Sequence, residues 1–200
     1  EVTALAQLAR IHNLWIFSDE VYERLLFCGI HLPIRVEAPE RTISIFSFSK
    51  AYAMAGYRCG FLLLPSSNFW EDLNKAVVHS FYSVSTPAQI VACTVLEQGD
   101  EWLQNIRNTY EKTGRMCAEL LGVSPPQGGT FLFFDIREQL NGRSMDDFLL
   151  SCIQHKLLLA PGASFGTGYE THIRVCFTSV RPQIVFEGMK ILERLLKDGS

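Results

Sequence analysis

Short apolar runs alternate with amphipathic segments in the first part of the chain. Apolar side chains at helical spacing predict a helix over residues 2–12, and the apolar run at 14–17 predicts a buried strand. Further strands are predicted at 42–46 and 60–64, with one helical turn at 51–55 that ends at a glycine. Helices that alternate with short buried strands indicate an α/β fold with a mostly parallel sheet.

The pattern becomes helical from residue 68 to residue 121. The apolar side chains of its last part lie on one face of a long helix, at spacings of four, four, seven and four residues: Trp102, Ile106, Tyr110, Cys117 and Leu121. A stretch rich in proline and glycine at 124–129 follows. Beyond it, strands at 130–136, 157–160 and 172–177 and helices at 145–153 and 185–196 predict a small α+β unit. We therefore expect two units, 1–100 and 101–200.

Composition excludes several classes of protein. The 200 residues include 18 Lys and Arg against 21 Asp and Glu, a net charge of −3, and no basic cluster that would bind nucleic acid. No apolar run approaches the ~18 residues of a membrane span. The six cysteines and five histidines show no metal-ligand spacing, so no metal is expected. We interpret the cysteines as reduced thiols of a cytoplasmic protein.

Reactive side chains follow two of the predicted strands. Asp19 ends the first strand, with Tyr22 close behind it, and Lys50 follows the second strand. If these strands are parallel neighbours, the carboxylate and the amine meet at one edge of the sheet, where α/β proteins bind ligands. Together with Ser47 and Arg58 they form the set that a pyridoxal phosphate site needs.

Several segments resemble one family closely. The segment at 47–60, SFSKAYAMAGYRCG, is similar to the pyridoxal-lysine signature of class I and II aminotransferases, and SDEVY at 18–22 resembles that family's aspartate and tyrosine segment. The segments at 128–133, 161–166 and 172–177 resemble its small-domain motifs: GGTFLF, PGASFG and HIRVCF. The resemblance extends over essentially the whole chain, in order.

The resemblance implies a role for each cofactor-binding residue. Lys50 would form the Schiff base with pyridoxal 5′-phosphate and would then carry a proton between the substrate and the cofactor. Asp19 would pair with the pyridine nitrogen, and Tyr22 with the ring oxygen. Ser47 and Arg58 would bind the phosphate.

The resemblance also implies the wider context. Arg174 would hold the α-carboxylate of the substrate in a bidentate contact that lysine cannot reproduce. The chain corresponds to the C-terminal half of a fold-type-I transferase, with 1–100 as the rest of the cofactor-binding domain and 101–200 as the interdomain helix and small domain. The family's glycine-rich phosphate loop and ring-stacking aromatic residue would lie outside it. We therefore expect weak cofactor binding by this chain alone, and a homodimer in the parent protein.

Three functions remain open from the sequence. The residue pattern SDEVYE favours an aminotransferase, which exchanges an amino group between an α-amino acid and a 2-oxo acid. A lyase of the same fold, acting by β-elimination or forming an aminocyclopropane, would use the same lysine. A non-catalytic fragment that binds a partner is the third alternative, and the intact set of charged residues argues against it.

Overall fold

The computed structural model describes residues 1–197, except for the side chain of residue 67, and falls into two compact units. The first is Glu1–Asn105, and the second begins at Ile106. The division falls inside the long helix α5 (Asp100–Leu121), near the boundary predicted after residue 100.

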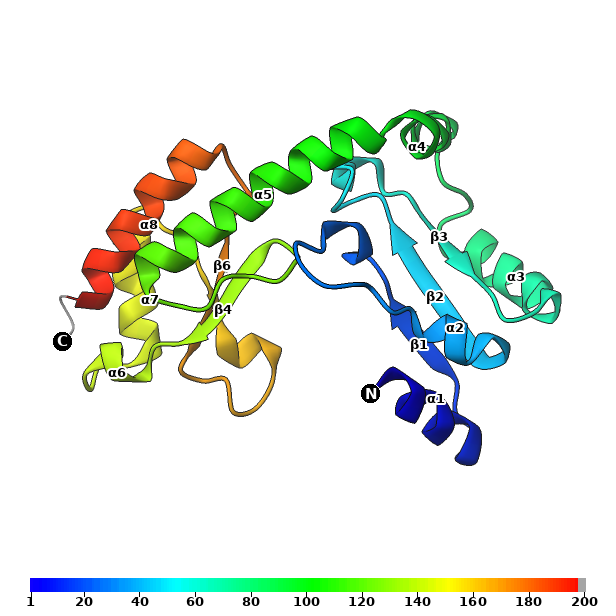
Figure 1. Ribbon diagram of the computed structural model, residues 1–200, viewed down its shortest axis with the longest axis horizontal. Coiled ribbons are helices and arrows are strands. Elements are labelled where there is room, and N and C mark those ends of the chain that lie inside the picture. The colour runs from blue at the N-terminus through cyan, green and yellow to red at the C-terminus, as the bar shows by residue number, and fades with distance from the viewer. Residues whose placement is uncertain (198–200) are drawn as a thin grey trace. The chain divides into compact units, whose positions relative to one another are not determined.

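The first unit is built on a three-stranded sheet in the order β1-β2-β3 (Figure 1). Its strands are β1 (Ile16–Asp19), β2 (Thr42–Ser47) and β3 (Gly60–Leu63). Strand β2 pairs parallel with β1 and antiparallel with β3. The α/β class is as predicted, but the described sheet is mixed rather than mostly parallel. The reason is that a short turn, not a crossover helix, joins β2 to β3 and reverses the chain.

Helices lie between and after these strands. Helix α1 runs where a helix was predicted, and the predicted helical region from residue 68 on contains three helices. The helices of this unit, besides the start of α5, are α1 (Val2–Ile11), α2 (Ile34–Glu37), α3 (Trp70–Ser80) and α4 (Thr86–Gln98). Four single turns of 3-10 helix join them: η1 (Glu23–Leu25), η2 (Pro39–Arg41), η3 (Ala55–Tyr57) and η4 (Ser67–Phe69).

Two local predictions are wrong. The strand expected at 14–17 lies at Ile16–Asp19 and is not buried, because it forms an edge of the described sheet and Phe17 is 69% exposed. The helical turn expected at 51–55 is a series of turns, and the 3-10 helix η3 follows it. This helix ends at Arg58, which adopts the left-handed conformation (φ 52°), rather than at Gly56.

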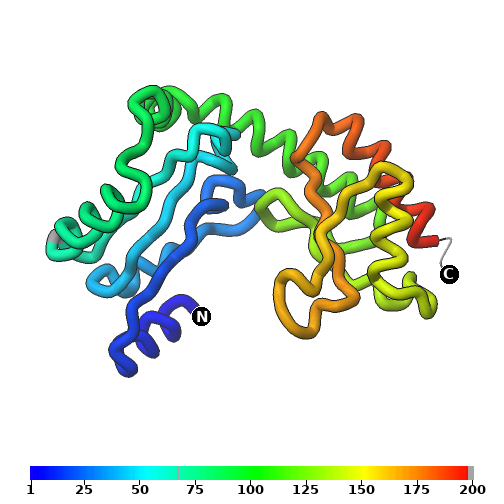
Figure 2. The backbone as a smooth tube through the Cα atoms, turned by 180° about the vertical axis from the view of Figure 1, so that it is seen from behind, coloured from blue at the N-terminus to red at the C-terminus, as the bar shows by residue number. Residues whose placement is uncertain are grey.

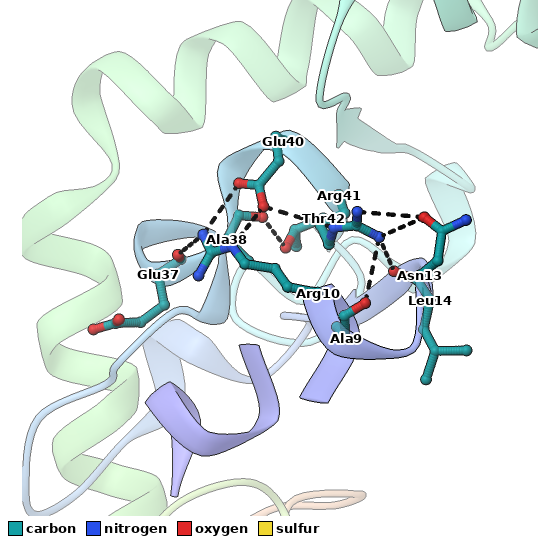
Figure 3. A network of polar contacts seen from close by, with 9 residues as sticks. All are labelled: Ala9, Arg10, Asn13, Leu14, Glu37, Ala38, Glu40, Arg41 and Thr42. Carbon is teal, nitrogen blue, oxygen red and sulfur yellow. Dashed lines mark hydrogen bonds and ion pairs between the residues drawn. The ribbon is translucent and has the colours of Figure 1, made fainter. Parts of the chain in front are cut away.

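A polar network connects α1 to the start of β2 (Figure 3). The guanidinium of Arg41 donates hydrogen bonds to the carbonyl oxygens of Ala9 (3.3 Å) and Leu14 (3.0 Å). Arg10 pairs with the Glu40 carboxylate at 2.9 Å, and this contact lowers the pKa of Glu40. The network gives a second donor to the Ala9 carbonyl in the last turn of α1, which also accepts the Leu14 N–H at 2.8 Å, and a donor to the Leu14 carbonyl just beyond the helix.

The second unit has a three-stranded antiparallel sheet in the order β4-β6-β5. Its strands are β4 (Phe131–Asp135), β5 (Ala160–Pro161) and β6 (His172–Cys176). The helices are the remainder of α5, α6 (Arg137–Leu140), α7 (Met145–Gln154) and α8 (Pro182–Lys197), with the 3-10 helix η5 (Gly162–Phe165). The strand predicted at 157–160 is wrong, because only Ala160 and Pro161 pair with β6 and Leu158 is 89% exposed.

One face of this second sheet is packed and the other is more open. Ile173 and Val175 of β6 are buried on the packed face, where α5, α7 and α8 gather (Figure 1). The alternate residues, Arg174 among them, are half-buried and belong to the opposite face. The core between sheet and helices includes the buried side chains Cys117, Phe148, Cys152, Phe177 and Leu192.

Two features bear on the class of protein. No disulfide links the cysteines in the described part of the chain. Among residues 1–197, no helix combines the length and the apolar character needed to cross a bilayer.

We expect Arg41→Lys to destabilise the protein by about 1–2 kcal/mol. Both carbonyl groups of Ala9 and Leu14 accept from the same guanidinium nitrogen, Nη1, but a lysine side chain is shorter and lacks the second nitrogen, Nη2, which donates to Asn13 Oδ1 at 3.4 Å. Charge-assisted hydrogen bonds are each worth about this much. Denaturant unfolding measures the change. Arg181→Lys, at an exposed position, is the control and should leave the free energy of unfolding within about 0.5 kcal/mol of the original.

Two buried thiols should resist modification near neutral pH. Burial raises the pKa of Cys117 and of Cys152 to about 11, whereas Cys93 is exposed. An alkylating agent at pH 8 should therefore modify Cys93 well before the buried pair, as peptide mass spectrometry would show. Equal rates at the three sites would contradict the packing described here.

The same two thiols make stability depend on alkaline pH. Their pKa values are higher in the folded chain than the ordinary value of 9.0, so the unfolded chain loses these protons first. Their contribution to stability is complete below pH 9 and decreases as the pH rises toward 11. Cys117→Ser and Cys152→Ser variants should each lose part of this dependence in unfolding experiments.

Candidate active site

The ends of β1 and β2 bring two chemically distinct residues to one edge of the first sheet. Asp19, the last residue of β1, pairs with Ile45 of the parallel strand β2, and the Glu20 N–H donates to the Ile45 carbonyl at 2.9 Å. Lys50 follows the end of β2. Strands β1 and β2 run side by side (Figure 2). Because parallel strands end at the same edge, Asp19 and Lys50 both leave the sheet there.

Backbone hydrogen bonds fix the turn that carries Lys50. The Phe48 N–H donates to the Cys59 carbonyl at 3.2 Å, and the Met54 N–H donates to the Phe48 carbonyl at 3.1 Å. The Ser47 hydroxyl accepts from the Ser49 N–H at 3.1 Å. The turn therefore returns on itself while the Lys50 side chain stays exposed to solvent.

Arg58 reaches the same edge from the other side of the turn. Strand β3 begins with Gly60 opposite Ser47, so Arg58 lies just before the start of β3 and beside the end of β2. Its Nη1 donates to the Ala55 carbonyl at 2.8 Å. A Cβ at position 60 would collide with the carbonyl oxygen of Phe46, so only glycine allows this close approach of β3.

The loop after β1 packs against the turn after β2. Arg24 donates a hydrogen bond to the Tyr52 hydroxyl at 3.4 Å, and this bond raises the pKa of Arg24. A cavity of about 180 Å³ lies between the two segments, lined by Glu20 and Arg24 on one side and by Ser47 and Tyr52 on the other. Tyr22 is half-buried in the same loop. Four of the predicted residues therefore lie at two strand ends and in the adjoining loops that follow them: Asp19 and Tyr22 at β1, and Ser47 and Lys50 at β2.

Three charged groups at this edge form no ion pair within the described residues. Among residues 1–197, no ion pair involves Asp19, Lys50 or Arg58. The Asp19 carboxylate accepts a hydrogen bond from the Val21 N–H at 3.2 Å. One anionic and two cationic groups fit a ligand with a protonated ring nitrogen, an aldehyde and a phosphate, which is the chemistry of pyridoxal phosphate.

Arg174 belongs to the second unit and is held between aromatic rings. Its guanidinium carbon lies 4.2 Å from the ring centre of Phe131 and 4.6 Å from that of Phe165. Within the described residues, no carboxylate pairs with it. Stacking on two rings restrains the guanidinium plane, which leaves its fork of N–H donors ready for an external carboxylate.

A second cavity is larger, but no charged side chain lines it. A groove of about 830 Å³ between β3 and α3 is lined by side chains such as Phe61, Trp70 and Phe81, and by no lysine, arginine, histidine or carboxylate. No cluster of metal ligands occurs in the part of the chain that the structure describes. The chemistry therefore concentrates at the edge formed by Asp19, Lys50 and Arg58.

The family is settled by comparison with known proteins. The model of the family "Aminotransferase class I and II" matches residues 1–187. The chain belongs to the class I and II aminotransferases.

Individual relatives agree with this membership. The arginine–pyruvate transaminase of Pseudomonas aeruginosa is 34% identical over 181 residues, which are 86% of this chain and 45% of that protein. The aspartate aminotransferase of Pyrococcus horikoshii is 26% identical over 96% of this chain and 51% of that protein. The crystal structure of an aromatic aminotransferase from Pyrococcus horikoshii superposes with a TM-score of 0.89, at 26% identity, over 98% of this chain and 55% of that chain. This aminotransferase chain thus spans about half the length of these relatives.

Sequence patterns missed some residues around the candidate site. Glu20 is buried and its Oε2 lies 2.7 Å from His31 Nε2, although the sequence pattern assigned a role to neither residue. The alternation of β1, which gives Ser18 and Glu20 the same face, is a signal that could have pointed to Glu20. The sequence pattern assigned no role to Phe131 or Phe165, and only tertiary packing shows that their rings hold Arg174.

Proposed function

We propose that the protein is a pyridoxal phosphate-dependent aminotransferase, which moves an amino group between an α-amino acid and a 2-oxo acid. The observation that carries the proposal is the group of unpaired charges at one sheet edge, Asp19, Lys50 and Arg58. Exposed charges of both signs that do not pair with each other are available to a ligand that carries a positive and a negative group, such as a protonated ring nitrogen and a phosphate. Family membership supports the same chemistry.

Each residue has a defined task in this proposal. When bound, the cofactor supplies an aldehyde for attachment to an amine and a ring that takes up electrons from the substrate. Lys50 would provide the amine and, once displaced by the substrate, would take and return the proton at the substrate Cα. Asp19 would keep the ring nitrogen protonated, and Tyr22 would hydrogen-bond to the ring oxygen. Ser47 and Arg58 bind the phosphate through a hydroxyl and a guanidinium.

Arg174 is proposed to bind the α-carboxylate that all α-amino acids and 2-oxo acids share. Two features support this role. The guanidinium is stacked between Phe131 and Phe165, and it has no carboxylate partner among residues 1–197. A bidentate contact to a carboxylate also fixes the orientation of the substrate, as a point charge does not.

The wider assignments are also proposals. We propose that the chain represents the C-terminal half of the parent protein, since its motifs resemble the lysine segment and small-domain segments of the family. We further propose a cytoplasmic homodimer that binds neither nucleic acid nor membranes. The net charge of −3 and the thiols without a disulfide are consistent with these assignments.

A lyase of the same fold is the second candidate that the sequence left open. The relatives named above are a transaminase and aminotransferases, which favours amino-group transfer. The products separate the two reactions. An aminotransferase supplied with an amino acid and a 2-oxo acid forms the exchanged pair, whereas a β-eliminating lyase releases ammonia and needs no 2-oxo acid.

Lys50 should be the preferred attachment site for pyridoxal phosphate. We expect reduction with sodium borohydride in excess cofactor to fix the label on Lys50 ahead of Lys112 and Lys156, because the proposed phosphate ligands Ser47 and Arg58 flank the turn that carries Lys50. Peptide mass spectrometry locates the label, and trapping by reduction detects even weak binding.

Two variants control this experiment. Lys50→Arg should abolish the preferred label, and Lys112→Arg should not change it. Label spread evenly over the lysines of the unaltered chain would contradict the proposed function.

Arg174→Lys should raise the KM for the amino acid by about 10- to 100-fold, with a smaller effect on kcat. The lysine keeps the positive charge but loses the bidentate contact and the stacking on both rings. Steady-state assays of amino-group transfer measure the two constants. Arg194→Lys, at an exposed position of α8, is the control. An unchanged KM in Arg174→Lys would remove this residue from substrate binding.

A further inference from the structure

A buried carboxylate lies directly behind the proposed cofactor edge. Glu20, the residue after Asp19, is only 4% exposed. The Ser18 hydroxyl donates to its Oε1 at 2.7 Å, and the imidazole Nε2 of His31 lies 2.7 Å from its Oε2. Both carboxylate oxygens are therefore engaged, while the Glu20 N–H continues the ladder to β2.

Such a carboxylate is not explained by stability alone. Removing a carboxylate from water is costly, and its contacts with one hydroxyl and one imidazole mainly compensate that cost. An apolar side chain would fill the same space without the penalty. Buried ionic groups of this kind can instead fix one conformation among several.

The conformation that the Glu20–His31 pair fixes is that of a loop. The pair joins the two ends of the segment 20–31, which contains Tyr22. Within the segment, Leu25 and Phe27 are buried and so attach its middle to the unit. The Glu23 N–H donates to the Glu20 carbonyl at 3.0 Å, so the turn that presents Tyr22 begins at Glu20 itself.

We propose that Glu20 and His31 are positioning residues that hold Asp19 and Tyr22 in place for the cofactor. This inference rests on the proposed function, because it assigns the pair to the same site. Side chains alternate along β1, so Glu20 anchors the buried side while Asp19 stays exposed on the other. Without the Glu20–His31 contact, the two ends of the loop are no longer joined, and Asp19 and Tyr22 gain conformational freedom. Cofactor binding must then remove this freedom, which weakens the binding.

The test compares three variants of the full chain. His31→Ala removes the imidazole from a position that is 36% exposed, so little packing is lost. Glu20→Gln keeps an acceptor for Ser18 and offers an amide N–H to the ring of His31. His12→Ala is the matched control, since His12 is an exposed histidine of the same unit without an ion pair in the described chain.

Two readouts are needed besides thermal unfolding. The first is the pyridoxal phosphate concentration at which borohydride labels half of Lys50. We expect His31→Ala to raise this concentration about 3- to 10-fold, which corresponds to the loss of one hydrogen bond. Glu20→Gln should raise the concentration less, and His12→Ala should leave it unchanged. The second is amide hydrogen exchange, which should accelerate in residues 21–31 of His31→Ala but not in residues 130–136.

The outcomes separate the two proposals. If the unaltered chain shows no preferred label on Lys50, the proposed function fails and this inference fails with it. If Lys50 is preferred but His31→Ala labels at the same cofactor concentration, the function stands and the positioning role is wrong. A lower unfolding temperature with unchanged labelling of the folded protein would mean a purely structural pair, which also overturns the inference.

Discussion

The parallel pairing of β1 with β2 is the constraint on which the candidate site depends. It matches Asp19 with Ile45 and is continued by the Glu20 N–H, so both strands end at one edge. A shift of one residue in this register would turn Asp19 toward the interior and bring Glu20 to the exposed side, because side chains alternate along a strand. The chemistry of the edge is therefore specified by the register, and the buried Glu20 opposes such a shift.

The two positive charges at this edge of the sheet repel each other, and an anionic ligand can offset that repulsion. Lys50 and Arg58 are like charges on the two sides of one turn, and neither has a carboxylate partner among residues 1–197. Solvent exposure reduces their repulsion, since the interaction of two unit charges at 4 Å in water is only about 1 kcal/mol. A phosphate bound by Ser47 and Arg58 would offset the repulsion and gain a charge-assisted hydrogen bond from the guanidinium. The arrangement thus favours an anion without requiring a strained protein.

Much of this could be predicted from the sequence, and the failures have a common cause. Helical periodicity located α1, α7 and α8, and the signature at 47–60 located the lysine turn, because both are local patterns. The antiparallel course of β3, the exposure of β1 and the two-residue β5 depend on which strand lies beside which. The contacts of Glu20 with His31 and of Arg174 with Phe165 join residues far apart in the sequence, and no local pattern encodes them.

The backbone of the lysine turn indicates why its side chains are available for binding. Ala53 (φ 54°) and Arg58 (φ 52°) adopt the left-handed conformation, which costs a residue with a Cβ about 1–2 kcal/mol. Hydrogen bonds of the Phe48 N–H and carbonyl stabilise the turn against this cost. Because the backbone bonds to itself, the Lys50 amine is not consumed in holding the turn, and the Arg58 guanidinium donates only to the nearby Ala55 carbonyl. A turn folded in this way loses little conformational entropy when a ligand binds, which is the advantage that strain at a functional site can provide.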